Sequence, residues 1–206
     1  MDQNTIEHPK RDRRLDPKRT AVLVVDAQMS EFNDDKRSEA PAYVEAIEKR
    51  ALPTMQKLIG TARDKGIEVI YTVIESLTKN GRDRSLDHKL SGLHVPKGSP
   101  LAKMIPGIEP EEDDIVLPKT SSGVFNSTNL DYVLRNLGIE NLIVMGFLTD
   151  QCVDMAVRDG ADKGYYMVCV SDGCATYTQA RHETALSAFG GYCRVQTADE
   201  VIESLS

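Results

Sequence analysis

The feature of this sequence that most constrains its fold is a series of short apolar runs separated by segments of helical periodicity. Residues 21–25, Ala-Val-Leu-Val-Val, are apolar at every position. A run without polar alternation is typical of a strand that is buried on both faces of a parallel sheet. We expect strands of this kind at residues 21–25, 67–74, 115–117, 142–145, 166–170 and 193–195, the third of them stopped by Pro118.

Segments with apolar residues at helical spacing lie between these runs. The longest, residues 42–65, contains Pro53 near an expected kink and ends before Gly66. Further helices are expected at residues 127–137, 152–163, 179–189 and 199–205. This alternation of strand and helix predicts an α/β fold with a three-layer, Rossmann-like architecture, in which helices flank a six-stranded, mostly parallel sheet.

The length of 206 residues fits a single domain with a sizeable core. Residues 1–19 are polar and basic, and we expect them to form an N-terminal arm on the surface or on a partner subunit; a loose tail fits their composition equally well. Residues 20–206 are expected to form the domain itself. Within it, residues 75–112 are charged and rich in glycine and proline, which predicts a lid-like insertion.

Charge and hydropathy narrow the expected partners and compartment. The net charge of −7 argues against nucleic acid or an anionic membrane as a partner. No apolar stretch approaches the length that spans a bilayer. The first six residues, Met-Asp-Gln-Asn-Thr-Ile, lack the basic and then apolar layout of a signal peptide. We therefore expect a cytoplasmic protein.

The four cysteines do not form a pattern typical of a disulfide framework or a zinc site. Cys169 and Cys193 lie inside apolar runs and are expected to be small buried side chains. Cys174 is expected just beyond a strand end, either near the site or purely structural. Cys152 differs, because it follows the run 142–145 and a glycine-containing turn, at the expected start of a helix. The helix dipole and the neighbouring amides would lower the pKa of its thiol, which predicts a nucleophile.

Two more reactive side chains stand at expected strand ends, Asp26 after the first strand and Lys119 after the third. Ligands of open α/β sheets bind beyond the carboxyl ends of the strands, so the fold can bring these side chains to Cys152. A carboxylate can take the thiol proton, an ammonium can stabilise the thiolate, and the thiolate can attack a carbonyl carbon. Singly, Asp26 could only cap a turn, Lys119 could be solvated and Cys152 could be a buried thiol. Together they predict a triad.

Three segments carry a resemblance to a known family: Val24-Val25-Asp26-Ala27-Gln28, Leu117-Pro118-Lys119 and Gly146-Phe147-Leu148-Thr149-Asp150-Gln151-Cys152-Val153. From about residue 18 onward the chain resembles the isochorismatase-like cysteine hydrolases, which include nicotinamidases, N-carbamoylsarcosine amidohydrolase, and biuret and ureidoacrylate hydrolases. The resemblance implies a parallel six-stranded sheet and a catalytic triad of Asp26, Lys119 and Cys152. It also implies a cis peptide between Phe147 and Leu148, and an oxyanion hole formed by the amides of Leu148 and Cys152.

No cofactor and no metal ion are expected. Nicotinamidases of this family carry an Asp-x-His metal site after the second strand, whereas this chain has Glu75-Ser76-Leu77 there, and His88 and His94 are isolated in a loop. True isochorismatases lack the nucleophilic cysteine, so Cys152 favours amide cleavage. The turn after the first strand has no Gly-x-Gly-x-x-Gly, which disfavours a dinucleotide site.

Candidate substrate contacts lie in loops near the expected strand ends. Aromatic side chains there would wall a pocket, a glutamine beside Asp26 would support the site, and arginines of the insertion, with His88, would receive a substrate carboxylate. A second glutamine would bond a substrate amide. The candidates are Gln28, Phe32, Arg82, Arg84, Phe125, Tyr177 and Gln179. Core aromatic side chains and solvated loop charges are the plainer interpretation of most of them.

These observations predict a hydrolase that cleaves the C–N amide bond of a small ureido or carbamoyl compound through a covalent acyl-enzyme intermediate. The missing metal site and the polar insertion favour this over a nicotinamidase-like or other small-amide hydrolase. A non-catalytic relative that binds a metabolite or a protein would also fit the fold, and a redox role of the thiol would need Cys174 close in space. The resemblance further suggests a homo-oligomer, either a dimer or a tetramer.

Overall fold

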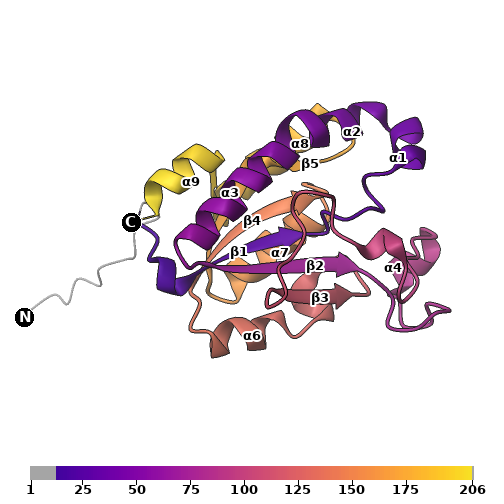
Figure 1. Cartoon of the computed structure of the whole chain (residues 1–206), viewed down its shortest axis with the longest axis horizontal. Helices are drawn as coiled ribbons and strands as arrows, with labels where there is room; N and C mark the ends of the chain where they lie inside the picture. The colour runs from indigo at the N-terminus through magenta and orange to yellow at the C-terminus, as the bar shows by residue number, and fades with distance from the viewer. Residues whose placement is uncertain (1–12, 206) are drawn as a thin grey trace, which may run out of the picture.

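The computed structural model describes residues 13–205 and has a six-stranded sheet at its centre (Figure 1). Its strands are β1 (Thr20–Val25), β2 (Glu68–Ile74), β3 (Ile115–Lys119), β4 (Asn141–Phe147), β5 (Tyr166–Ala175) and β6 (Cys193–Gln196). All neighbouring strands pair in parallel, in the order β3-β2-β1-β4-β5-β6. The order of strands therefore reverses between β1 and β4.

Helices cover both faces of the sheet, so the predicted three-layer α/β fold is confirmed (Figure 1). Helices α3 and α9 contact each other on one face, and α7 with α5 and α6 covers the other. The helices are α1 (Asp34–Glu39), α2 (Pro41–Ala46), α3 (Leu52–Asp64), α4 (Leu86–Leu90), α5 (Val124–Ser127), α6 (Leu130–Asn136), α7 (Cys152–Asp162), α8 (Gln179–Ala188) and α9 (Ala198–Ser204). Between residues 13 and 205, none is long and apolar enough to cross a membrane.

The two central strands explain why the apolar runs are uninterrupted. Every residue of β1 and every residue of β4 is buried. Both faces of these strands lie under helices, so residues 21–25 and 142–145 have no solvent-exposed face on which polar side chains would alternate. Burying an aliphatic side chain of this size contributes roughly 1.5–3 kcal/mol, which makes these strands the centre of the core.

Strand β3 is longer than predicted, because it continues through Pro118 to Lys119. It lies at the edge of the sheet and pairs only with β2. An edge strand tolerates proline, since one side of its backbone has no neighbouring strand to accept a hydrogen bond. As a result, Lys119 is part of the strand, and its side chain is fully buried.

The helix predicted at residues 127–137 is divided into α5 and α6. Thr128 separates them with an extended backbone (φ −137°, ψ 175°). Its hydroxyl donates to the carbonyl oxygen of Val124 at 2.7 Å and accepts the amide of Leu130 at 3.1 Å. A threonine that bonds neighbouring backbone groups in this way competes with the helix, and the helical spacing of the apolar residues does not reveal it.

The helix predicted at residues 42–65 is continuous but irregular. A π-helical turn, Ile47–Ala51, joins α2 to α3, and Pro53 is the second residue of α3. Proline has no N–H group for the bond to the preceding turn, and a widened turn accommodates that gap. Strand β5 is also longer than predicted: it extends to Ala175, so Cys174 lies within the strand and not beyond its end.

The insertion, residues 75–112, is held against the domain by backbone contacts. The amide of Met29 donates to Lys103 O at 2.8 Å, and the amide of Ile105 donates to Ala27 O at 3.0 Å. An isolated bridge pairs Gln28 with Met104. Helix α4 and a 3-10 turn, Pro100–Ala102, are its regular parts. A lid function for this segment stays a prediction.

The described part of the N-terminal arm packs on its own domain. The Arg13 guanidinium donates to Asn141 Oδ1 at 2.6 Å and lies over the ring of Tyr166. Leu15 is buried and forms a bridge with Leu205 of the C-terminal segment. Residues 1–12, the rest of the predicted arm, lie outside the described residues. Contact of the arm with a partner subunit therefore stays a prediction.

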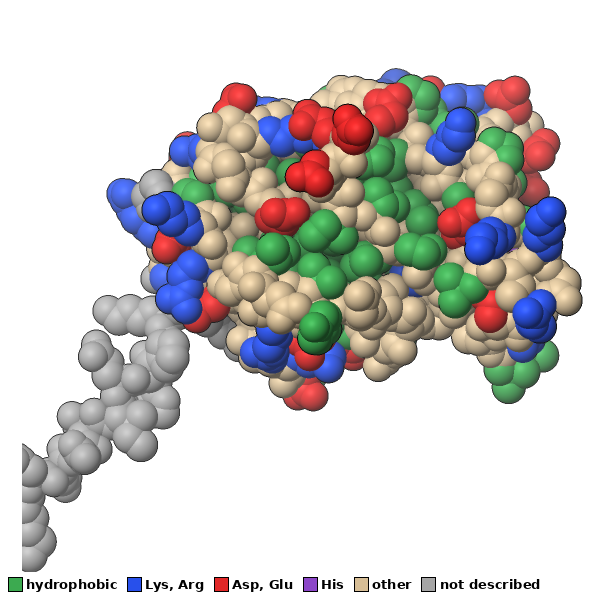
Figure 2. Space-filling view, turned by 60° about the horizontal axis from the view of Figure 1, so that its bottom comes forward, with side chains coloured by type: hydrophobic (Ala, Val, Ile, Leu, Met, Phe, Trp, Pro, Cys, Tyr) green, Lys and Arg blue, Asp and Glu red, His purple; other side chains and the backbone are tan. Residues whose placement is uncertain are grey.

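Apolar side chains gather in the middle of the face in Figure 2. A hollow lined by such side chains borders the sheet edge, where Val116 of β3 is 40% exposed. Its apolar lining consists of Met29, Val73, Ala102, Met104, Pro106, Pro110 and Val116. The candidate catalytic residues do not line this hollow.

Candidate active site

The two central strands lead into the candidate site. Asp26 directly follows β1, and Cys152 begins α7 shortly after β4. Parallel sheets open a crevice beyond the carboxyl ends of their strands where the strand order reverses, which here is between β1 and β4. Gly146 (φ +136°) allows the close approach of the two strands, since a Cβ atom there would lie 2.0 Å from Val25 O.

Three buried side chains meet at this crevice. Lys119 Nζ lies 2.8 Å from Asp26 Oδ2 and 3.4 Å from Cys152 Sγ. The same ammonium donates to the carbonyl oxygens of Ser121, at 2.9 Å, and Ser122, at 3.2 Å. Asp26, Lys119 and Cys152 are 1%, 0% and 5% exposed. The fold thus brings the three sequence-predicted residues into contact, and a catalytic role for each of them stays a prediction.

Neighbouring strands hold Asp26 in a defined orientation. Its backbone is left-handed (φ +50°), a conformation that aspartate tolerates better than most residues. The Thr72 hydroxyl donates to Asp26 Oδ1 at 2.8 Å. Gln28, from the same turn, accepts the amide of Ile74 at 2.6 Å and donates to the carbonyl oxygens of Ile74 and Leu101. The buried Gln28 side chain therefore supports the turn that carries Asp26.

The thiol environment differs from the sequence prediction. Burial and the negative charge of Asp26 raise the pKa of the Cys152 thiol to about 12, and the positive charge of Lys119 only partly opposes them. The prediction of a lowered pKa from the helix dipole is therefore wrong. Burial outweighs the dipole because the thiolate would lose its hydration with a carboxylate next to it. At neutral pH the thiol keeps its proton.

The segment between β4 and α7 is anchored at several points. The Phe147–Leu148 peptide bond is cis. The Thr149 amide donates to Ala175 O at 3.0 Å, and the Thr149 hydroxyl lies 2.9 Å from Nδ1 of the buried His182. These contacts fix the backbone directly before Cys152, where the amides of the expected oxyanion hole lie.

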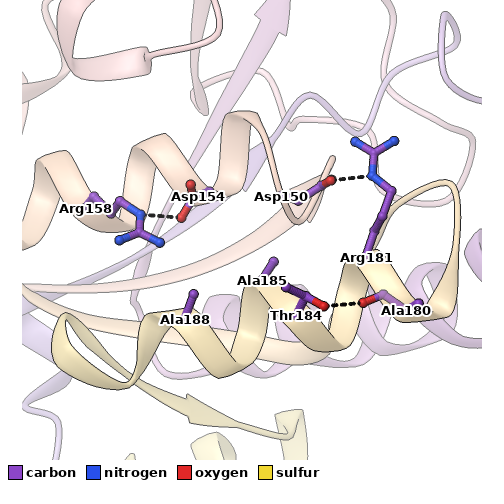
Figure 3. Close-up of a pocket in the computed structure, with 8 residues that line it drawn as sticks. All are labelled: Asp150, Asp154, Arg158, Ala180, Arg181, Thr184, Ala185 and Ala188. Atoms are coloured by element: carbon purple, nitrogen blue, oxygen red, sulfur yellow. Dashed lines mark hydrogen bonds and ion pairs between the residues drawn. The ribbon is translucent and has the colours of Figure 1, made fainter.

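Asp150 adds a second anchor to this segment. Its carboxylate accepts hydrogen bonds from the Thr176 hydroxyl at 2.6 Å and from Arg181 Nε at 2.5 Å. Figure 3 shows Asp150 and Arg181 pointing toward one another across the groove between α7 and α8, with a second ion pair between Asp154 and Arg158. Because Arg181 belongs to α8, this helix helps to hold the loop that leads to Cys152.

The contact of His182 with Thr149 makes the segment before Cys152 sensitive to pH. Burial, and then the charge of Arg50, lower the pKa of its imidazole, while Glu183, the Ser171 carbonyl and Asp150 partly oppose them. The unfolded chain, with a histidine pKa of about 6.5, then binds more protons than the folded chain between the two pKa values. Stability contributed by neutral His182 is therefore complete above about pH 6.5 and is lost as the pH falls toward the folded pKa.

We expect the melting temperature of the protein to fall between pH 7 and pH 5, and to fall less for His182→Asn, which keeps a polar atom near the position of Nδ1. Thermal unfolding of both proteins at the two pH values measures the difference. Carboxylates titrate alike in both proteins, so their contribution cancels. An equal fall in both proteins would contradict this role of His182.

A cavity of about 530 Å³ opens above Cys152, a size typical of small-molecule sites. It is lined by Asp26, Glu31, Lys36, Glu39, Ile74, Ser91, Gly92, Leu93, Ser122, Phe147, Leu148, Gln151, Cys152 and Tyr177. Of the seven predicted substrate contacts, the lining includes Tyr177. The wall is formed by β-strand ends, by α1 with the turn before it, and by the insertion.

The other six predicted contacts do not line this cavity. Gln28 is fully buried, and Arg84 is occupied with the carbonyl oxygens of Gly81, His88 and Leu93. Arg82 bonds Asn80, Gln179 bonds Glu183, Phe125 stacks on Tyr165, and Phe32 packs against the core. A substrate contact by any of these six stays a prediction from the sequence alone.

Glu31 and Lys36 are cavity residues that sequence reasoning missed. Both lie in residues 30–39, Ser-Glu-Phe-Asn-Asp-Asp-Lys-Arg-Ser-Glu, which has the composition of a solvated charged loop. The one available signal is Asn33, whose side chain accepts the Lys36 amide at 2.8 Å and starts α1. An N-cap predicts a helix, but it does not predict that one charged side chain of the helix faces a cavity.

The described residues offer no group of three or more His, Cys, Asp or Glu side chains arranged to hold a metal ion. His88 is buried, with Nε2 3.5 Å from Ser122 Oγ, and it does not line the cavity. The four cysteines are free and buried, as was predicted for Cys169 and Cys193. Cys174 Sγ lies 3.9 Å from Cys169 Sγ.

A doubly wound parallel sheet with a buried Asp–Lys–Cys cluster at its switch point is the architecture of a cysteine hydrolase. The family model of the isochorismatase domain matches residues 20–200 of the sequence, and the chain belongs to this family. Among curated relatives, the ureidoacrylate amidohydrolase of Rhizobium rhizogenes is 30% identical over 180 residues, covering 77% of this chain and 71% of that protein. The ureidoacrylate amidohydrolase of Acinetobacter baylyi is 30% identical over 183 residues, covering 78% and 72%.

Solved structures agree with this assignment. A cysteine hydrolase from Pseudomonas syringae pv. phaseolicola superposes with a TM-score of 0.85 at 26% identity, covering 97% of this chain and 98% of that chain. The N-carbamoylsarcosine amidase of Thermoplasma acidophilum superposes with a TM-score of 0.71 at 25% identity, covering 88% and 97%.

Proposed function

We propose that this protein is a cysteine-dependent hydrolase that cleaves a C–N bond of a small ureido or carbamoyl compound. The observation that carries the proposal is the buried contact of Lys119 with both Asp26 and Cys152 at the floor of a cavity. A base, a cation and a nucleophile in mutual contact are the groups that acyl transfer through a thioester requires.

In the first half of the reaction, Asp26 takes the proton of the Cys152 thiol, and the sulfur attacks the carbonyl carbon. The raised thiol pKa agrees with this order, because the proton must move to a base before the sulfur can attack. The amides of Leu148 and Cys152 donate to the oxyanion. The C–N bond then breaks, and the leaving nitrogen receives the proton from Asp26.

In the second half, water attacks the thioester, or the thiocarbamate if the substrate is a urea. Asp26 takes a proton from this water, and the proton returns to the sulfur as the acid leaves. Lys119 stays positively charged throughout: burial lowers the pKa of its ammonium, but Asp26 and Cys152 together outweigh burial and leave the pKa above its ordinary value. A permanent cation stabilises the thiolate without exchanging protons.

A ureido or carbamoyl substrate is supported by the names of the relatives, two ureidoacrylate amidohydrolases and an N-carbamoylsarcosine amidase. The polar part of the cavity wall, with Glu31, Lys36, Ser91 and Gln151, suits a small molecule that carries several N–H and oxygen groups. Nicotinamide is the alternative substrate, and it would use less of this polar wall.

Assembly and location are part of the proposal. We expect a homo-oligomer, because Leu77, Leu86 and Leu90 of the insertion are 56%, 70% and 79% exposed and an apolar hollow borders β3. Light scattering of the purified protein tests this. The net charge of −7 supports a small molecule as the partner in place of nucleic acid. We also propose a cytoplasmic location, which the four free cysteines support.

Ammonia release from a panel of small amides tests the activity. We expect turnover of ureido compounds, such as biuret or a ureido acid, with a kcat/KM at least about 100-fold above that for nicotinamide, because nicotinamide leaves polar cavity groups unpaired. Each compound is assayed with the wild-type and the Cys152→Ala protein. Preference for nicotinamide would move the assignment to a nicotinamidase-like hydrolase. Absence of any Cys152-dependent turnover would support a non-catalytic binding protein.

A further inference from the structure

Lys36 is held in position at the cavity wall by the start of α1. The side chain of Asn33 accepts the Lys36 amide at 2.8 Å, which fixes the backbone of the lysine. The Lys36 side chain is only 19% exposed, although the helix that carries it is on the surface. Its ammonium lies 3.5 Å from the hydroxyl of Tyr177, another residue of the cavity wall.

The charge of Lys36 is only weakly paired inside the protein. Its one ion pair among the described residues is a 3.8 Å contact with Glu39 Oε2, whose side chain is 70% exposed. Burial lowers the pKa of the Lys36 ammonium, but Glu31, Tyr177 and Glu39 outweigh burial and leave the pKa above its ordinary value. The ammonium is therefore charged at neutral pH. Its three N–H groups have two partners, Tyr177 at 3.5 Å and Glu39 at 3.8 Å, so it can still donate to another acceptor.

The other cations near the site are already engaged. Lys119 contacts Asp26, Cys152 and two backbone carbonyl oxygens. Arg84 donates to three backbone carbonyl oxygens, away from the cavity. Among the described residues that line the cavity, Lys36 is the one with a cationic side chain. A carboxylate that enters this cavity has Lys36 as its partner.

Glu31 places a negatively charged, hydrogen-bond-accepting group in the same cavity wall as the Lys36 ammonium. Its carboxylate accepts the Tyr43 hydroxyl at 3.1 Å. Burial raises the pKa of the Glu31 carboxyl, and Glu31 lines the same cavity as Asp26, Lys36 and Cys152. The cavity wall thus carries a hydrogen-bond acceptor, Glu31, and a cation, Lys36, which lies beside Tyr177.

We propose that this layout selects a ureido carboxylic acid, whose ureido N–H groups bond Glu31 and whose carboxylate binds the Lys36 ammonium and the Tyr177 hydroxyl. The inference rests on the proposed function and deepens it: the same C–N bond is cleaved, and Lys36 decides which ureido compounds bind well. A neutral compound such as biuret reaches Glu31 and the triad but has no negatively charged group for Lys36.

The test compares 3-ureidopropionate with biuret in the wild-type, Lys36→Met and Lys36→Arg proteins. Losing a charge-assisted contact with the carboxylate should lower the kcat/KM ratio of 3-ureidopropionate to biuret by roughly 10- to 100-fold in Lys36→Met. The loss should appear mainly as a higher KM for 3-ureidopropionate, and Lys36→Arg should restore most of it. Lys49→Met is the matched control, since Lys49 is 75% exposed and pairs only with Glu45 among the described residues; its ratio should stay at the wild-type value.

An unchanged ratio in Lys36→Met would overturn the inference. Binding measured by calorimetry separates this result from a failure of the proposed function. The Cys152→Ala protein should bind 3-ureidopropionate, and Cys152→Ala/Lys36→Met should bind it at least about tenfold more weakly. Equal binding by both proteins would remove the carboxylate site whether or not turnover occurs. Cleavage of biuret without binding of 3-ureidopropionate would remove only the carboxylate site and leave the proposed hydrolase in place.

Discussion

Replacing Cys152 with alanine is expected to lower kcat by at least about 10⁴-fold, because the nucleophile that forms the acyl intermediate is removed. Neither Asp26 nor Lys119 can take over the attack, since Asp26 is held by Thr72 and Lys119 is held by Asp26 and two carbonyl oxygens. Loss of one buried sulfur should cost on the order of 1 kcal/mol of stability. Ammonia release measures the activity, and circular dichroism with thermal unfolding checks the fold.

Cys169→Ala is the matched control for this substitution. Cys169 is also a fully buried cysteine, but it lies inside β5 and its sulfur contacts that of Cys174. Its replacement should cost similar stability and leave kcat within about threefold of wild type, since it does not line the cavity. Intact-mass measurement of the wild-type protein during turnover should show an acyl adduct that the Cys152→Ala protein lacks. Retained turnover in Cys152→Ala would contradict the covalent mechanism.

Neutralising one member of the Asp26–Lys119 pair is expected to destabilise the fold by about 3–5 kcal/mol, because the other member becomes a buried charge without a partner. The two side chains are 2% and 0% exposed, so water cannot replace the lost partner. Asp26→Asn and Lys119→Met are the single changes, and denaturant unfolding measures them. Removing both charges together should cost less than the sum of the two single changes. Simple additivity would show that the pair is not coupled in the folded state.

The same variants test the roles within the site. Asp26→Asn keeps the shape of the side chain but cannot accept the thiol proton, so kcat should fall by about 10²–10⁴-fold. The double variant should be folded and nevertheless inactive, which separates catalysis from stability. An active Asp26→Asn protein would assign the base to another residue.

The strands and the fold class were predictable because burial on both faces leaves a direct mark on the sequence. All six strands lie where apolar runs occur, and β1 and β4 are buried throughout. The errors arose where one backbone group decides the structure. Thr128 divides a predicted helix, and Pro118 is tolerated because β3 is at the edge of the sheet. Neither effect is visible in the spacing of apolar residues.

The meeting of Asp26, Lys119 and Cys152 was also predictable, since each lies at or shortly after the carboxyl end of a strand and a parallel sheet brings such ends together. Their protonation was not predictable. A helix start indicates a lowered thiol pKa, but the thiol is only 5% exposed and faces a carboxylate, and its pKa is about 12. Burial depends on what packs around a residue, which the local sequence does not state.

The sequence by itself therefore determined the parallel sheet and the three reactive side chains at its edge, because hydrophobic periodicity and strand ends are local properties. Only the tertiary structure decided which side chains surround those three. In the folded protein Arg84 donates to backbone carbonyl oxygens, and Lys36, which comes from a charged segment of the sequence, lines the cavity. The physical reason is that the direction of a surface side chain costs little energy locally, so contacts between distant segments, such as Lys36 with Tyr177, determine it.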